Sequence, residues 1–181
     1  TNLNKIFNTG AVNGGTNVGG LVGTLENSNL TEGVNTANIS GVNSVGGLVG
    51  SANNTNTTTT MVDSNQVQIV NCFNSGNSAS GLVGTSSGAN QYNKVWITSC
   101  YSVANTTVGT IAGTMTNTEL QRVYYLEDKG GTPTTGAVAK SGQEMSGEDA
   151  VSTTRLNLDP TMWTAVANEN GEYNLPMLNS F

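Results

Sequence analysis

Short apolar segments recur along the chain at a nearly regular spacing, and each of them is flanked by glycine. The phrase Val-Gly-Gly-Leu-Val-Gly occupies residues 18–23 and returns at 45–50, with related copies at 80–84 and 108–113. Counted from the Leu or Ile of each copy, the offsets are 27, 34 and 29 residues. Self-similarity with a period of about 20 to 50 residues is typical of a solenoid, in which every repeat forms one coil.

A second short segment precedes each glycine-rich phrase and carries one larger apolar or aromatic residue. Short segments bounded by Gly, Asn and Ser predict strands and turns, not helices. The glycines would supply positive φ at sharp corners and let neighbouring backbones stack closely. Two internal columns of stacked side chains are expected, with Leu21, Leu48, Leu82 and Ile111 in one and Phe7, Val34, Phe73 and Tyr101 in the other.

The composition indicates a thin but regular core. Of the 181 residues, 35% are hydrophobic and only 10% are charged, whereas disordered chains usually carry high charge. The net charge of -6 argues against nucleic acid and against an anionic membrane surface as partners. No apolar run approaches the roughly 20 residues that span a bilayer, so we expect no membrane insertion.

The two cysteines, Cys72 and Cys100, lie 28 residues apart, which is one repeat. They are expected at equivalent positions of neighbouring coils, about 4.8 Å apart. In-register stacking does not favour the dihedral angle of a disulfide, so we predict two buried free thiols. The chain has no His, and no third ligand recurs with the cysteines, so neither a metal nor a cofactor is expected.

The Gly-Leu-apolar-Gly phrase, preceded by a strand of the Asn-Cys-Phe-Asn-Ser-Gly type at residues 71–76, resembles the GLUG-motif repeats of bacterial surface proteins. That family includes the repeat regions of IgA-specific metallopeptidases and large adhesin-like proteins. The resemblance covers residues 4–126 and implies an all-β fold, a right-handed parallel β-helix of about four to five coils. It also implies an extracellular location at the bacterial cell surface. It carries over no catalytic residue, and the His-Glu-x-x-His helix of a zinc peptidase is absent.

The 34-residue interval contains the polar residues 51–65, which predict a loop that leaves the coil edge, and a shorter excursion is predicted at 85–94. Loops on a rigid scaffold often carry binding residues. The candidate ligand-contact residues are Asn53, Asn54, Asn56, Thr57, Asp63 and Trp96. Two alternatives stay open: the loop is a flexible insertion that costs little, and Trp96 packs beneath the second excursion.

The C-terminal third differs in character, because nine of the 12 acidic residues and every proline lie after residue 118. This shift predicts β-helix coils over 1–126 and a C-terminal capping segment over 127–181. The sequence Ser146-x-x-Asp149 has the form of a capping box and predicts a short helix over 147–156. An open solenoid end exposes core and strand edges. We therefore expect five apolar residues to pack on the terminal coil: Met145, Val151, Leu156, Trp163 and Leu178. At the N-terminus no comparable cap is found, and further repeats of the same polypeptide are expected before Thr1.

Two classes of function fit these features. A carbohydrate-active β-helix enzyme, such as a polysaccharide lyase or hydrolase, needs clustered carboxylates on one face of the coils. Residues 1–118 offer three scattered acids and two lysines. We therefore expect a non-catalytic repeat segment of a secreted bacterial cell-surface protein. It would serve as a scaffold or stalk and in adhesion to a host glycan or matrix protein, with the enzyme as the alternative.

Overall fold

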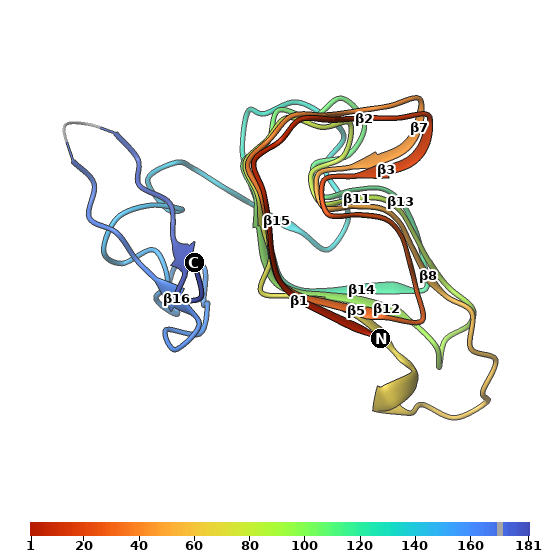
Figure 1. Cartoon of the computed structure of the whole chain (residues 1–181). Coiled ribbons are helices and arrows are strands. Elements are labelled where there is room, and N and C mark those ends of the chain that lie inside the picture. Colours follow the sequence, from red (N-terminus) through yellow and green to blue (C-terminus); the bar gives the residue numbers. More distant parts are fainter. Residues whose placement is uncertain (170–171) are drawn as a thin grey trace.

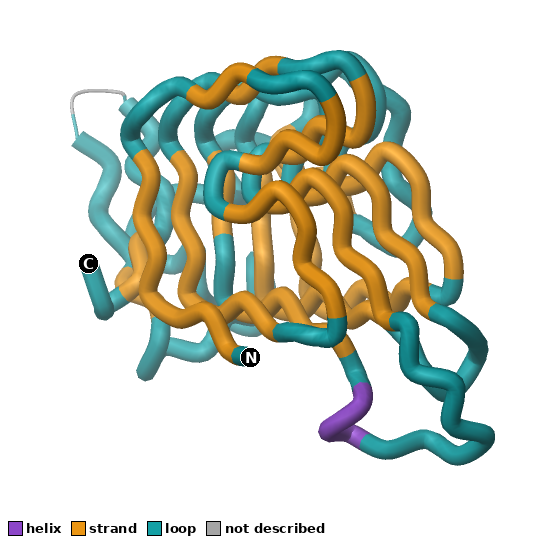
Figure 2. The backbone as a smooth tube through the Cα atoms, turned by 45° about the vertical axis from the view of Figure 1, so that its right-hand side comes forward, coloured by secondary structure: helices purple, strands orange, loops and turns teal. Residues whose placement is uncertain are grey.

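The computed structural model describes residues 1–169 and 172–181. The chain forms a parallel β-solenoid of about five turns, which confirms the predicted all-β fold class. Figure 1 looks almost along the solenoid axis, so successive coils overlie one another, and Figure 2 shows the same coils stacked side by side. The C-terminal segment lies beside the coils, next to β1 and β15 in Figure 1.

One sheet has seven strands and follows the order β1-β5-β10-β12-β14-β15, with β9 pairing to both β5 and β12. All of its pairs are parallel, as expected when each coil adds one strand. Its strands are β1 (Asn2–Asn8), β5 (Asn29–Asn35), β9 (Val67–Val70), β10 (Phe73–Asn74), β12 (Val95–Ser102), β14 (Thr118–Leu126) and β15 (Val138–Lys140).

A second, four-stranded sheet follows the order β13-β11-β8-β4 and closes the other side of the coils. Its strands are β4 (Val22–Glu26), β8 (Val49–Asn54), β11 (Val83–Gly88) and β13 (Ala112–Thr116). The first two coils also form a lobe in which β2 (Val12–Asn13) pairs with β6 (Ile39–Ser40) and β3 (Thr16–Gly19) pairs with β7 (Asn43–Gly46). The remaining elements are the 3-10 turn η1 (Asp63–Asn65) and the antiparallel pair β16 (Trp163–Thr164) and β17 (Met177–Leu178).

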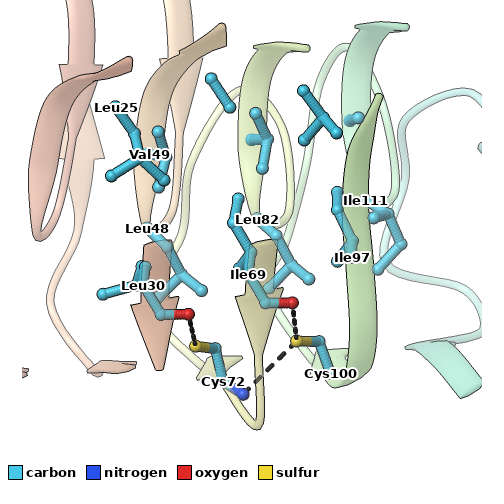
Figure 3. Close-up of a cluster of buried hydrophobic side chains, with 14 of the residues drawn as sticks. Leu25, Leu30, Leu48, Val49, Ile69, Cys72, Leu82, Ile97, Cys100 and Ile111 are labelled. Carbon is cyan, nitrogen blue, oxygen red and sulfur yellow. Dashed lines mark hydrogen bonds between the residues drawn. The ribbon is translucent and has the colours of Figure 1, made fainter. Parts of the chain in front are cut away.

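The core between the two sheets consists of stacked apolar side chains. Leu48, Leu82 and Ile111 are fully buried in one column, and Leu21 is half-buried in the first coil. This confirms the predicted leucine column (Figure 3). Cys72 and Cys100 stack in the same core as buried free thiols, as predicted. Burial, followed by the neighbouring Cys100 thiol, raises the pKa of Cys72.

The glycine-rich phrases do not use positive φ, in contrast to the prediction. Among the described residues, the glycines with positive φ lie between Gly130 and Gly147. The corners within the seven-stranded sheet are instead formed by non-glycine residues at one repeated position: Lys5, Glu32, Asn71, Ser99 and Arg122. Glycine is needed in the phrases for space. A Cβ atom on Gly47 would lie 2.0 Å from Nδ2 of Asn74.

The second predicted column exists, but it faces outward. Its members follow one another in register, and Phe7 at its start is exposed: Phe7, Val34, Phe73, Tyr101 and Tyr124. Cys72 and Phe73 are consecutive, so their side chains point to opposite faces, and Cys72 occupies the interior. The phenyl ring of Phe73 stacks on the ring of Tyr101, with their centroids 5.0 Å apart. The prediction that this column is internal was therefore wrong.

This outward column determines where the C-terminal segment packs. Met145, Leu156, Trp163 and Leu178 cover Val34, Phe73, Tyr101 and Tyr124 in one buried cluster, with Val151 at its margin. The Tyr101 hydroxyl donates a hydrogen bond to the carbonyl oxygen of Pro176 at 2.6 Å. The segment therefore covers the side of several coils, and the predicted packing on the terminal coil was wrong. The outward column offers the segment a continuous apolar surface to bury, and removing that surface from water is favourable.

The predicted helix at 147–156 is absent, and the chain there forms consecutive turns. Gly147 has a φ of 81°, which is incompatible with a helix, and the Ser146 hydroxyl donates to the carbonyl oxygen of Gly142 instead of capping. The reciprocal capping contacts lie five residues earlier. Ser141 N–H donates to the Glu144 carboxylate at 2.9 Å, and Glu144 N–H donates to the Ser141 hydroxyl at 3.3 Å.

The strand edge of the last coil is partly closed by one hydroxyl group. Oγ1 of Thr134 accepts hydrogen bonds from the N–H groups of Ile111 and Ala112, both at 3.0 Å. It also donates to the carbonyl oxygen of Ala112 at 3.2 Å. Thr134 thus takes the place of a further strand at this position, so buried backbone groups keep their partners.

Candidate functional site

The repeat changes most between the second and third coils. Equivalent residues are 27 apart between the first two coils, 39 apart at Asn35 and Asn74, and 34 apart at Ser51 and Thr85. The insertion is therefore longer than the 34-residue spacing indicates, because the third coil has lost part of the lobe that β2, β3, β6 and β7 form. Strand β8 extends through Asn54, so the loop covers residues 55–66 and starts later than predicted.

The loop is fixed to the coils by asparagine side chains. Nδ2 of Asn54 donates to the carbonyl oxygens of Asn65 and Lys94, at 2.7 and 2.8 Å. Nδ2 of Asn56 donates to the carbonyl oxygen of Asn65 at 3.0 Å. Asn54 is only 2% exposed, so its amide serves the framework of the loop. These contacts argue against a loosely attached insertion.

The second excursion is bound to the first. Strand β11 runs through Gly88, so the projecting residues are 89–94, fewer than predicted. Oγ1 of Thr58 donates to Oδ1 of Asn93 at 2.7 Å, and Nδ2 of Asn93 donates back to the carbonyl oxygen of Thr58 at 2.8 Å. Nε2 of Gln66 donates to the carbonyl oxygen of Tyr92 at 2.8 Å. The two excursions form a single hydrogen-bonded unit on successive coils.

A groove of about 380 Å³ lies between residues 61–66 of the first excursion and the outer face of the seven-stranded sheet, and we call it the Trp96 groove. It brings together Asp63 from the loop and Trp96 from β12, two of the residues that the sequence singled out. Its full lining is Met61, Asp63, Gln66, Gln68, Val70, Trp96, Thr98 and Gln121.

Trp96 points outward because of the alternation along β12. Its neighbours Val95 and Ile97 are fully buried in the core, and Trp96 itself is half-buried. In register with it are Gln68 on β9 and Glu119 on β14. The indole thus lies in the wall of the groove and keeps part of its surface open to solvent.

The other predicted residues lie elsewhere. Asn53 is on β8, where its side chain accepts a hydrogen bond from the Ser51 hydroxyl at 3.2 Å, and Thr57 is exposed on the loop. Neither of them lines the groove. The sequence reasoning missed Gln68 and Gln121. A signal existed for Gln68, because it and Trp96 are 28 residues apart and each is flanked by two buried apolar residues.

The electrostatic character of the site is simple. Lys94 and Glu119, beside the groove, form an ion pair with Nζ and Oε1 2.5 Å apart.

Within residues 1–169 and 172–181, no group of three His, Cys, Asp or Glu side chains is placed to hold a metal ion. The described part of the chain likewise contains no helix long and apolar enough to cross a membrane.

Comparison with known proteins identifies a similar fold. The chain matches the crystal structure of a protein described as a "putative immunoglobulin A1 protease" from Bacteroides ovatus, with a TM-score of 0.61 and 20% sequence identity. The match covers 99% of this chain and 58% of that chain. No protein-family model and no curated protein matches the sequence. At this identity the similarity shows the fold alone, which places the chain in the class of parallel β-solenoids.

Proposed function

We propose that this chain is a non-catalytic repeat segment of an exported bacterial cell-surface protein, in which it acts as a rigid scaffold and presents an adhesive site at the Trp96 groove. The observation that carries the proposal is the pair of hydrogen-bonded excursions on successive coils, the first of which lines the groove together with Trp96. A site held on regular coils needs little ordering when it binds a ligand.

The scaffold role is supported by the continuous core. Leu48, Leu82 and Ile111 stack through successive coils, and the C-terminal segment covers the outside of the same coils. The bacterial setting is supported by the fold similarity to the Bacteroides ovatus protein. The non-catalytic role is supported by the chemistry of the groove, whose lining includes one carboxylate, Asp63, where hydrolysis of a glycosidic bond uses a pair.

The test is a binding screen of the whole chain against immobilised host glycans and matrix proteins. It runs beside a variant in which residues 57–64 are replaced by a short Gly-Ser link. This replacement keeps Asn54, Asn56 and Asn65, so β8 and the loop ends retain their contacts. A Val42→Ser variant, altered at a side chain that is 78% exposed in the lobe, is the surface control.

We expect binding by the wild type and by Val42→Ser, with loss in the loop variant while its circular dichroism spectrum is unchanged. Equal binding by all three proteins would show that adhesion does not use the groove. A complete lack of binding by the wild type would leave only the scaffold role.

A further inference from the structure

The polar side chains that line the Trp96 groove differ in how many hydrogen bonds they already make. The Gln66 amide is saturated, since Nε2 donates to the carbonyl oxygens of Val62 and Tyr92 and Oε1 accepts from Lys94 N–H. Within the part of the chain that the structure describes, the side chains of Gln68, Thr98, Gln121, Asp63 and Trp96 make no hydrogen bond to protein. The groove therefore offers several free donors and acceptors around one indole.

These groups form an ordered array. Trp96 lies beside Gln68 on the neighbouring strand, and two positions further along the strands Thr98 lies in register with Val70 and Gln121. Neighbouring strands are about 4.8 Å apart, so the side chains of Gln68, Thr98 and Gln121 lie on the same face as the indole of Trp96 and close to it. Ligand sites combine an apolar surface with a few placed polar groups. A sugar ring has the matching arrangement, because its C–H face is apolar and its rim carries hydroxyl groups.

Charge selects among the ligands of this kind. Asp63 is the one ionisable side chain in the groove lining, and the nearby Lys94 ammonium is already paired with Glu119. The whole chain carries a net charge of -6. A sialylated, sulfated or uronic-acid ligand would meet repulsion without a compensating cation. A cavity of about 380 Å³ is also of small-ligand size, whereas stable protein interfaces bury about 800 Å² on each partner.

We propose that the Trp96 groove binds a neutral oligosaccharide, with a sugar ring stacked on the indole and its hydroxyls hydrogen-bonded by Gln68, Gln121 and Asp63. This proposal rests on the adhesive role proposed above and names the ligand class of that site. The two amides each supply donors and an acceptor, and the carboxylate accepts from hydroxyl groups.

The experiment titrates the whole chain with neutral oligosaccharides and with sialylated, sulfated and uronic-acid oligosaccharides of similar length. Binding is followed by calorimetry and by tryptophan fluorescence. Trp163, the other tryptophan, is 1% exposed in the C-terminal cluster, so a change in fluorescence on binding reports Trp96. The variants are Trp96→Ala, Trp96→Phe and Gln68→Ala. Tyr173→Ala is the matched control, because that ring is 61% exposed outside the groove.

The expected result is binding of a neutral oligosaccharide that weakens about tenfold or more in Trp96→Ala, as for a truncated aromatic anchor. Trp96→Phe should retain part of the affinity, and Tyr173→Ala should bind as the wild type does. A preference for anionic sugars would overturn the proposal, as would wild-type affinity in a folded Trp96→Ala variant. Loop-dependent binding of a matrix protein without any sugar would overturn the glycan assignment alone, whereas no binding at all would overturn adhesion as well.

Discussion

Asn74 is the residue whose removal should most directly test how the coils are held together. Its side chain is fully buried in a ladder of equivalent asparagines that begins with Asn8 and Asn35. Nδ2 donates to the carbonyl oxygens of Gly76 and Gly81, both at 2.8 Å. Oδ1 accepts from Nδ2 of Asn35 at 2.8 Å and from Gly76 N–H at 3.1 Å.

The magnitude follows from these contacts. Each hydrogen bond contributes a net 0.5 to 1.5 kcal/mol, and a buried group left without a partner costs about 1 to 3 kcal/mol. Asn74→Ala removes the four hydrogen bonds described and leaves their buried partners unpaired. We therefore expect the free energy of unfolding to fall by about 4 kcal/mol. Asn8→Ala is the matched control. Asn8 is half-buried in the first coil and bonds to Gly10 and Asn35, where water can replace the amide, so about 1 kcal/mol is expected.

The assay is urea unfolding followed by circular dichroism, with the free energy of unfolding extrapolated to water. We expect both variants to keep the m-value of the wild type. The m-value must be checked, because repeat proteins can lose cooperativity and free energies of unfolding are comparable only when the slopes agree. Equal decreases in the free energy of unfolding for Asn74→Ala and Asn8→Ala would refute the reasoning, because the expected difference comes from the full burial of Asn74.

Three further predictions concern the C-terminal segment and the core. Trp163→Ala removes a ring whose centroid lies 6.1 Å from that of Phe73 and 5.5 Å from that of Tyr101. The free energy of unfolding should fall by about 3 to 5 kcal/mol, and limited proteolysis should cleave the C-terminal segment first. The backbone N–H of Ser141, and then Lys140, lower the pKa of Glu144 from 4.5 to about 2, so its stabilising effect is present above pH 4.5 and disappears as the pH falls towards 2. Thermal midpoints of wild type and Glu144→Gln should therefore differ at neutral pH and converge near pH 2. Both cysteines are buried, so a thiol reagent should modify them only when the chain unfolds, and modification of the native protein would contradict the packing.

The sequence predicted those parts of the fold that repeat. The column of Leu48, Leu82 and Ile111 and the paired free thiols follow from spacing alone, because equivalent residues of a solenoid lie above one another. The outward direction of Phe73 could also have been found. It follows Cys72 directly, and only one of two consecutive strand residues can face the core.

Other features depend on tertiary contacts that spacing does not encode. The corners at Glu32, Asn71 and Ser99 require positive φ, a conformation that costs energy for these residues and is maintained by the pairing of neighbouring coils. The turns at 147–156 depend on Gly147 and on the covering of the aromatic column, so a local capping signal at Ser146 was misleading. In the candidate site, Asp63 was recognisable because it lies in the insertion, and Trp96 because it is an aromatic residue at the start of a strand after the second excursion. Gln121 was not, because its place in the groove depends on register with β12.

The Trp96 groove lies where two successive coils both carry an excursion, and this coincidence has a physical reason. A single insertion in one coil would lose its order easily, because a loop of this length has few partners of its own. Here the loop is anchored at Asn54 and bonded through Gln66 to the excursion of the next coil. Each excursion thereby supplies hydrogen-bond partners that the other lacks, and the first excursion is held over the outer face of the seven-stranded sheet. In a solenoid, paired excursions at equivalent positions of successive repeats can therefore order each other, and they hold a surface groove in place better than one long loop would.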